Sequence, residues 1–337
     1  MLSLQKQNEH LQKVSRSFAL TIPVLNARLQ DIIANAYLLC RIADTVEDDP
    51  ALVTDKKIQW LYDFARLADR LFADEALALN LKERSKVLKD SAKEYEYCLM
   101  LDMLEVIQRT LSYEKPYIEV VARGVALLAY GMAQHLETTS IGTLEDLDSY
   151  CYSVAGVVGE LLARLFAIDE NMEESVRKHL IVLSVSFGEG LQLTNILKDR
   201  SEDIKRGVSF LPPLDTDEKE SVIKYTAVTA GHLFDAIDFI CSLPKDKSGS
   251  RMFCLTNVIM ALLTLRKIGK NPFGDQSCLK ISRRQVFIVY ALCKLFCRNN
   301  SALRLIAYTA SLGLTIKKRD YRELYHRVSM WQSSIPL

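Results

Sequence analysis

Apolar residues recur at helical spacing along almost the whole chain, and residues that interrupt helices are few. The 337 residues include 13 glycines and 8 prolines, and no glycine precedes Gly124. This periodicity, without alternating strand patterns, predicts an all-α fold. The interruptions are short, and no linker is long enough to separate two domains. We therefore expect one helical bundle with a central cavity, formed by residues 1–337 as a single domain.

The helical pattern can be divided into segments at these interruptions and at capping signals. Thr143 followed by Glu145 and Asp146 is typical of a helix start, with a side-chain oxygen as cap and acids in the first turn. The predicted helices cover residues 26–48, 55–75, 84–112, 115–138, 144–166, 174–204, 216–242, 251–268, 279–297, 300–315 and 318–333.

Composition excludes several function classes. A formal net charge of +1 removes the usual electrostatic reason to expect nucleic acid as a partner. Eight cysteines without a CxxC pair predict buried free thiols in a reducing compartment. The stretch 286–297 is apolar but short and contains Lys294, so no segment is expected to span a bilayer. We expect a cytoplasmic protein; for the amphipathic residues 286–315, core packing is favoured over peripheral membrane contact.

Two acidic pentads of the form Asp-x-x-Glu-Asp are the main candidates for a functional site. The first comprises residues 44–48 and the second residues 199–203. On a helix the outer aspartates are four residues apart and share a face with the glutamate. Such close like charges repel, and a hard divalent cation with oxygen ligands would offset the repulsion.

The residues before each pentad extend it into a narrow polar stripe. Tyr37 and Arg41 share a helix face with Asp44 and Asp48, and Gln192 and Asn195 share one with Asp199 and Asp203, while both segments are otherwise apolar. A solvated acidic face is the alternative interpretation. The mirrored stripes instead favour a polar-lined cavity inside a bundle.

This pattern predicts a magnesium enzyme that ionises a prenyl diphosphate. Mg²⁺ held by a few carboxylates binds substrate phosphates through its remaining positions. Arg41 lies near the first pentad and Lys198, Lys205 and Arg206 lie near the second, where they could neutralise a departing diphosphate. Apolar walls would house the hydrocarbon and protect a carbocation from water.

Four blocks of the chain resemble the head-to-head prenyl synthases, the family of squalene and phytoene synthases. They are SRSFAL (15–20), YLLCRIADTVEDD (37–49), YCYSVAGVVGELL (150–162) and GEGLQLTNILKDRSEDIKRGVSFLP (188–212). Weaker similarity in 253–265 and 279–285 is closest to the squalene synthase branch. The absence of the C-terminal anchor of eukaryotic members leads us to expect a bacterial-type or truncated enzyme.

The resemblance implies an isoprenoid-synthase domain, expected as a monomer, and a two-step reaction. Two farnesyl diphosphates condense to presqualene diphosphate, which NADPH then reduces to squalene. Several Mg²⁺ ions would be required. Dehydrosqualene, phytoene or presqualene diphosphate synthases, which stop before reduction or use other substrates, are alternatives within the family. A non-catalytic assembly factor of the same fold is the alternative from another class.

The resemblance also assigns roles to residues. Tyr150 matches the tyrosine that opens the family's Tyr-Cys block and would remove a proton during cyclopropane formation. A phenol near pKa 10 is a poor base in water, so it needs nearby positive charge. The implied metal ligands are Asp44, Glu47, Asp48, Asn195, Asp199, Glu202 and Asp203. The implied substrate-binding residues are Ser15, Arg16, Ser17, Phe18, Tyr37, Arg41, Val154, Ala155, Val158, Gly159, Gln192, Lys198 and Arg206. The implied cofactor-binding residues are Arg16, Arg41, Lys198, Lys280 and Arg283.

Several positions depart from the squalene branch. Lys198 stands where that branch has arginine, so the charge stays but the bidentate fork is lost. Ser282 occupies the place of a second basic residue, and Asn257 and Val258 replace a tendency toward Pro-Gln. For Ser15 and Ser17, a helix-cap role is an equal alternative to diphosphate contact. For Ala155, Gly156 and Gly159, close helix packing is an alternative to making room for the prenyl chain. The departures from the squalene branch concern the reductive step more than ionisation.

Overall fold

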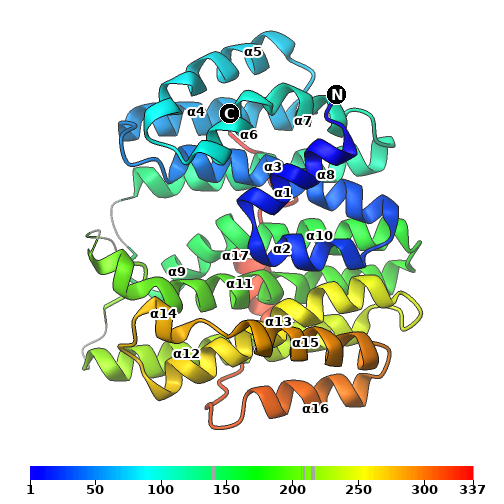
Figure 1. The fold of residues 1–337 in the computed structure, drawn as a ribbon, viewed down its shortest axis with the longest axis vertical. Helices are drawn as coiled ribbons and strands as arrows, with labels where there is room; N and C mark the ends of the chain where they lie inside the picture. Colours follow the sequence, from blue (N-terminus) through cyan, green and yellow to red (C-terminus); the bar gives the residue numbers. More distant parts are fainter. Residues whose placement is uncertain (139–140, 206, 208, 214–216, 337) are drawn as a thin grey trace. The chain divides into compact units, whose positions relative to one another are not determined.

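The computed structural model describes residues 1–138, 141–205, 207, 209–213 and 217–336, and of these the side chain of residue 16 is left out. These residues form helices and no strand, which confirms the predicted all-α class (Figure 1). Contacts within the chain divide it into two compact units. A single domain over 1–337 therefore stays a prediction, and each unit is described by itself.

The first unit comprises Met1–Thr139, Arg164–Asn171 and Met330–Leu337. Within it α4 packs along α8, and α3 packs against α7 and α8. Its helical elements are α1 Leu4–Val14, α2 Arg16–Thr21, η1 Ile22–Val24, α3 Ala27–Glu47, α4 Thr54–Asp69, α5 Glu75–Arg84, η2 Ser85–Asp90, α6 Glu94–Leu101, α7 Met103–Thr110 and α8 Lys115–Glu137.

Helix α3 carries the first acidic pentad, and its two ends are set by side chains. Asn26 caps its start by accepting a hydrogen bond from the Leu29 amide at 2.9 Å. After its end, Asp49 accepts from the amides of Ala51 and Leu52 at 3.0 and 2.8 Å. Pro50 cannot donate a backbone hydrogen bond, so the chain turns here and the pentad occupies the last turn of α3.

The second unit comprises Ser140–Ala163 and Met172–Ser329. The 32-residue helix α11 is its axis and packs against α12, α13, α17 and the π-helical turn η3. Its helical elements are α9 Leu144–Cys151, η3 Tyr152–Gly156, the first part of α10 Val157–Asp169, α11 Glu174–Lys205, α12 Glu218–Ser242, α13 Ser248–Lys270, α14 Gln276–Leu279, α15 Arg283–Phe296, α16 Asn300–Ala310 and α17 Tyr321–Val328.

Two glycines bring the backbone of α11 into contact with the η3–α10 segment. A Cβ on Gly159 would lie 2.1 Å from the Ser184 carbonyl oxygen, and one on Gly188 would lie 2.1 Å from the Ala155 carbonyl oxygen. Only a residue without a side chain allows such an approach. Close helix packing therefore accounts for Gly159, where we had favoured room for a prenyl chain.

Several predicted helices differ from the observed ones for local reasons. The segment 84–112 is split, because Asp102 ends α6 and bonds the side chains of His10 and Lys6 at 2.8 Å each. The segment 144–166 contains the π-helical turn η3. Helix α9 begins at the predicted place, where Thr143 and Asp146 form a capping box. The helices α1, α2 and α5 were not predicted.

The length of the apolar helical stretches and the exposure of some cysteines also differ from expectation. Within the described ranges, three helical stretches are long and apolar enough to cross a membrane by length and composition alone: Leu144–Asp169, Glu174–Lys205 and Ser248–Lys270. Between 67% and 78% of their most apolar windows is buried inside the fold, so packing accounts for this apolarity. All eight cysteines are free as predicted, but Cys98 and Cys278 are exposed and Cys241 is half-buried.

Candidate functional site

The first acidic motif forms a polar stripe on an otherwise buried helix. Tyr37, Arg41 and Asp44 are half-buried and Asp48 is exposed, whereas Leu38, Ile42, Ala43 and Val46 are buried. Arg41 lies 3.6 Å from Asp44 and also pairs with Glu96 of α6. Thus one guanidinium is shared between the motif and a neighbouring helix of the same unit.

Two carboxyl groups of this motif, those of Asp44 and Glu47, resist ionisation. Burial raises the pKa of Asp44 to about 7; Arg41 opposes the rise, and Asp48 adds to it. Burial also raises the pKa of Glu47 to about 8, with Asp44 and Asp48 contributing repulsion. The ammonium of Lys57, which opposes the rise for Glu47, donates to the Glu47 carbonyl oxygen at 2.7 Å. A divalent cation bound by these oxygens would stabilise their charged forms.

The block at residues 15–20 lies beside the same stripe. Ser15 caps α2 by accepting from the Phe18 amide at 3.1 Å, so it fills the capping role that we had considered for it. The Phe18 ring lies 5.1 Å from the ring of Tyr37, whose hydroxyl donates to the Val14 carbonyl at 3.4 Å. Ser17 is exposed, and the side chain of Arg16 lies outside the described residues.

The second acidic motif lies on α11 and is linked to the late basic block. Lys198 bonds Asn195 at 3.0 Å and pairs with Asp199 at 3.2 Å. Gln276 of α14 donates to Asp199, and Lys280 donates to Gln276 at 2.7 Å. This chain of contacts brings the predicted cofactor residue Lys280 close to the pentad.

The remaining residues of the second motif differ in exposure. Asp203 is buried, Gln192 is half-buried, and Glu202 is exposed and pairs with Lys205 at 2.9 Å. Arg206 lies outside the described residues. Because the two motifs belong to different units, a joint site stays a prediction.

Tyr150 lies in the last turn of α9, two residues before the π-helical turn begins at Tyr152. It is 9% exposed, and its ring stacks on Phe210 with centroids 5.0 Å apart. Single π-turns inside helices are frequent at functional sites. Val154, Ala155 and Val158 are half-buried along the turn and the start of α10, whereas Gly159 is buried against α11.

Sequence reasoning missed a buried polar cluster in the second unit. Asp148, Glu189 and His232 place ligand-type atoms within 4.8 Å of one another. Arg319 binds Asp148 with two hydrogen bonds of 2.6 and 2.7 Å, and Arg327 also pairs with Asp148. Both arginines pair with Asp148 and offset its charge, so the cluster needs no metal ion for neutrality. We interpret it as structural.

Spacing could not reveal this cluster, because its members are about 40 residues apart in the sequence. The His232 ring is buried in the packing of the unit, with Nδ1 3.3 Å from the Ser186 hydroxyl. The available signal was Glu189, a charged residue inside the apolar part of α11. Both its carboxylate oxygens lack a hydrogen-bond partner.

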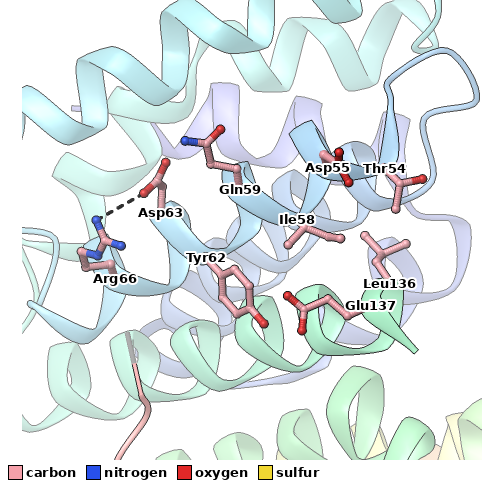
Figure 2. Close-up of a pocket in the computed structure, with 9 residues that line it drawn as sticks. All are labelled: Thr54, Asp55, Ile58, Gln59, Tyr62, Asp63, Arg66, Leu136 and Glu137. Carbon is pink, nitrogen blue, oxygen red and sulfur yellow. Dashed lines mark ion pairs between the residues drawn. The ribbon is translucent and has the colours of Figure 1, made fainter. Parts of the chain in front are cut away.

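A separate surface pocket of about 730 Å³ lies between α4 and α8 in the first unit (Figure 2). Asp55, Asp63, Tyr62 and Glu137 line it, and Arg66 pairs with Asp63 at 3.4 Å. Burial, together with Glu137, raises the pKa of Tyr62 to about 12. None of the lining residues drawn in Figure 2 belongs to the predicted site.

The fold and these motifs define an all-α protein with acidic clusters on two long apolar helices. Residues 11–285 match the squalene/phytoene synthase family. The chain belongs to this family.

Individual relatives agree with this assignment. The chain is 34% identical to squalene synthase 1 of Arabidopsis thaliana over 293 residues, covering 81% of this chain and 67% of that protein. It is 29% identical to a squalene synthase of Candida albicans over 296 residues, covering 82% of this chain. The chain spans only 64% of the length of that relative.

Solved structures show the same fold. A complex of TcSQS with a ligand matches with a TM-score of 0.75 and 23% identity over 96% of both chains. A dehydrosqualene synthase complex matches with a TM-score of 0.56 and 18% identity, covering 87% of this chain and 95% of that one. At these identities the likeness concerns the fold.

Replacing Glu189 by glutamine tests the electrostatics of the buried cluster. Burial raises the pKa of Glu189 well above its ordinary value, and Asp148 adds to the rise while Arg319 and Arg327 oppose it. The folded state thus holds a proton that the unfolded state loses above pH 4.5. This contribution to stability is complete below that pH and is lost as the pH rises, by roughly 1.4 kcal/mol per pH unit.

We therefore expect Glu189→Gln to raise the melting temperature relative to the wild type by an increasing margin from pH 5 to pH 8. Thermal unfolding followed by circular dichroism would measure this margin. Glu220→Gln, at an exposed position of α12, is the control and should give no such trend. A Glu189→Gln effect that is the same at every pH would contradict the predicted protonation.

Proposed function

We propose that this chain is a squalene synthase. It would condense two farnesyl diphosphates head to head into presqualene diphosphate and reduce that product to squalene with NADPH. Family membership supports the prenyl-transfer chemistry. The observation that carries the proposal is the first acidic motif, in which Arg41, Asp44 and Asp48 form a polar stripe at the end of the otherwise buried helix α3.

The donor sets fit Mg²⁺. The first motif offers the carboxylates of Asp44, Glu47 and Asp48, and the second offers Asn195, Asp199, Glu202 and Asp203. These are the hard oxygen ligands that magnesium prefers. When bound, Mg²⁺ would neutralise the substrate diphosphate and make it a better leaving group.

The basic side chains of the motifs would assist the same charge neutralisation. Arg41 lies beside Asp44, and Lys198 lies between Asn195 and Asp199. Both can donate to phosphate oxygens, although the ammonium of Lys198 lacks the planar fork of arginine. Neither side chain is fully exposed, which strengthens its interaction with an anion.

Tyr150 would act as the base of the first condensation. Its phenol oxygen would take the proton whose loss closes the cyclopropane ring of presqualene diphosphate, while its own hydroxyl proton would pass to the released diphosphate. The stack on Phe210 and the position at the end of α9 fix the direction of the ring. The half-buried Val154, Ala155 and Val158 would contact the prenyl chains.

The late basic block fits the phosphate groups of NADPH. Lys280 and Arg283 are exposed and offer an ammonium and a guanidinium, and Lys280 is joined through Gln276 to Asp199. NADPH would supply the hydride for the second step. Ser282, where a basic residue was expected, caps α15 by a capping box with Gln285.

A non-reducing synthase is the second candidate. The observation that favours it is the neighbourhood of Asn257 and Val258 on α13. Val258 is fully buried, and the Asn257 side chain donates to the Phe253 carbonyl of its own helix at 2.8 Å. Both replacements therefore serve the packing of α13.

Incubation of the purified protein with farnesyl diphosphate and Mg²⁺, with and without NADPH, tests the proposal. We expect squalene only with NADPH and presqualene diphosphate without it, identified by mass spectrometry of extracted products. Dehydrosqualene or presqualene diphosphate under both conditions would support the non-reducing candidate. No product from farnesyl or geranylgeranyl diphosphate would favour a non-catalytic assembly factor.

Asp44→Asn and Asp199→Asn test the two acidic motifs separately. We expect each to lower turnover of farnesyl diphosphate by roughly 100-fold or more, because each removes a charged ligand of a cation that neutralises the leaving group. Each should also reduce the rise in melting temperature that Mg²⁺ and inorganic diphosphate give the wild type.

Exposed aspartates provide matched controls, with Asp90→Asn in the first unit and Asp246→Asn in the second. Neither should alter turnover. If either motif variant kept wild-type turnover, its motif would have no role in magnesium binding.

Tyr150→Phe tests the proposed base. The substitution keeps the stacked ring and removes only the hydroxyl, so the melting temperature should stay within a few degrees of the wild type. We expect presqualene diphosphate formation to slow by roughly 100-fold, the usual scale for loss of a general base. Reduction of supplied presqualene diphosphate should change much less. An unchanged rate of the first step would remove Tyr150 from the mechanism.

A further inference from the structure

Helix α15 exposes apolar side chains on the side where a surface helix normally carries polar ones. Val289 and Cys293 are buried against the rest of the second unit. On the opposite side Phe287 and Leu295 are each 72% exposed, and Ile288 is 46% exposed. Core packing, which we favoured for residues 286–315, therefore accounts for one side of this helix only.

Helix α16, which lies beside α15 (Figure 1), also packs on α13. It too has a buried side and an exposed apolar side. Leu303 and Ala307 are buried, whereas Leu305 and Tyr308 are 62% and 59% exposed. Leu312, seven residues after Leu305, is exposed as well. Exposed apolar residues scattered singly are normal, but rows of them on two neighbouring helices indicate an interaction surface.

The charge of this region is one-sided. Residues 276–319 contain nine lysines and arginines and no aspartate or glutamate, in a chain whose net charge is +1. Three of the nine, Arg304, Lys318 and Arg319, pair with acids of other helices. On α15, Arg284 and Lys294 are exposed beside the apolar residues, and no ion pair joins them to an acid in the described part of the chain.

We propose that the exposed faces of α15 and α16 dock on the surface of an anionic lipid bilayer. The docking face consists of Arg284, Phe287, Ile288, Lys294 and Leu295 of α15 with Leu305 and Tyr308 of α16. Phe287 and Leu295 enter the boundary between headgroups and acyl chains, while Arg284 and Lys294 contact lipid phosphates. An apolar row flanked by lysine and arginine is the pattern of helices that lie in a membrane interface.

The positive charge of the docking face favours a lipid bilayer, and not a second copy of this chain, as its binding partner. A symmetric contact through this face would place the cations of one copy against those of the other, without acids to offset them. A bilayer with acidic headgroups supplies the missing negative charge and an apolar layer together. The proposal does not depend on the proposed reaction, because it concerns a surface and its probe is a vesicle.

Flotation of the full chain with vesicles tests the proposal. We expect binding to vesicles of phosphatidylcholine with phosphatidylglycerol, and much weaker binding to phosphatidylcholine alone. Arg284→Gln with Lys294→Gln should lower binding to the anionic vesicles by roughly tenfold and remove most of its salt dependence. Phe287→Ser with Leu295→Ser should lower binding by at least roughly tenfold at every salt concentration.

Leu79→Ser with Val87→Ser is the matched control, because these residues of the first unit are also exposed and apolar. It should bind like the wild type, and circular dichroism should show that all variants fold. Absence of wild-type binding to anionic vesicles would overturn the proposal, as would equal binding by all three double variants. So would a wild-type dimer that fails to bind vesicles and that Phe287→Ser with Leu295→Ser converts to a monomer in sedimentation equilibrium.

Discussion

Helices α3 and α11 pack into the core but also carry carboxylates. The need to compensate the charge of these carboxylates is the constraint on which the rest of the structure depends. Helix α3 buries 13 of its 21 residues and α11 buries 15 of its 32, and both carry acids whose charge the surrounding protein does not fully balance. Taking a carboxylate out of water favours its neutral form, and a second carboxylate one turn away strengthens that preference. Each such group must be protonated, paired with a cationic side chain or bound to a metal ion.

The C-terminal part of the second unit provides pairing with cationic side chains. Arg319 and Arg327 bind Asp148 on α9, and the Ser329 hydroxyl donates to Glu160 on α10 at 2.9 Å. The Tyr152 hydroxyl donates to the same carboxylate at 2.7 Å. These contacts hold both sides of the π-helical turn that follows Tyr150. A segment that is distant in sequence thus fixes the helix that carries the proposed base.

Local signals in the sequence were sufficient for the long helices and for the acidic motifs. Asn26 and Pro50 bound α3, and Thr143 begins α9, because caps and helix breakers act over a few residues. Contacts between segments that are distant in the sequence could not be predicted. The association of Glu189 with His232 arises from the packing of α11 on α12, and the split at Asp102 arises from its contact with His10. The outward direction of Phe287 depends on which side of α15 meets α13, and helical periodicity could not decide this for a helix that is apolar on both sides.

Asp44 and Glu189 show how the same physical cost leads to different uses. Glu189 is sealed inside the unit, where Arg319 and Arg327 offset the charge of its neighbour Asp148 and no solvent reaches its oxygens. Asp44 lies at the end of a helix with its side chain 32% exposed, and Arg41 is shared with Glu96, so its compensation is incomplete. An incompletely compensated carboxylate that ligands can reach is able to exchange its proton for a metal ion. Accessibility, more than the number of acids, therefore distinguishes the motif suited to binding from the cluster suited to holding the fold together.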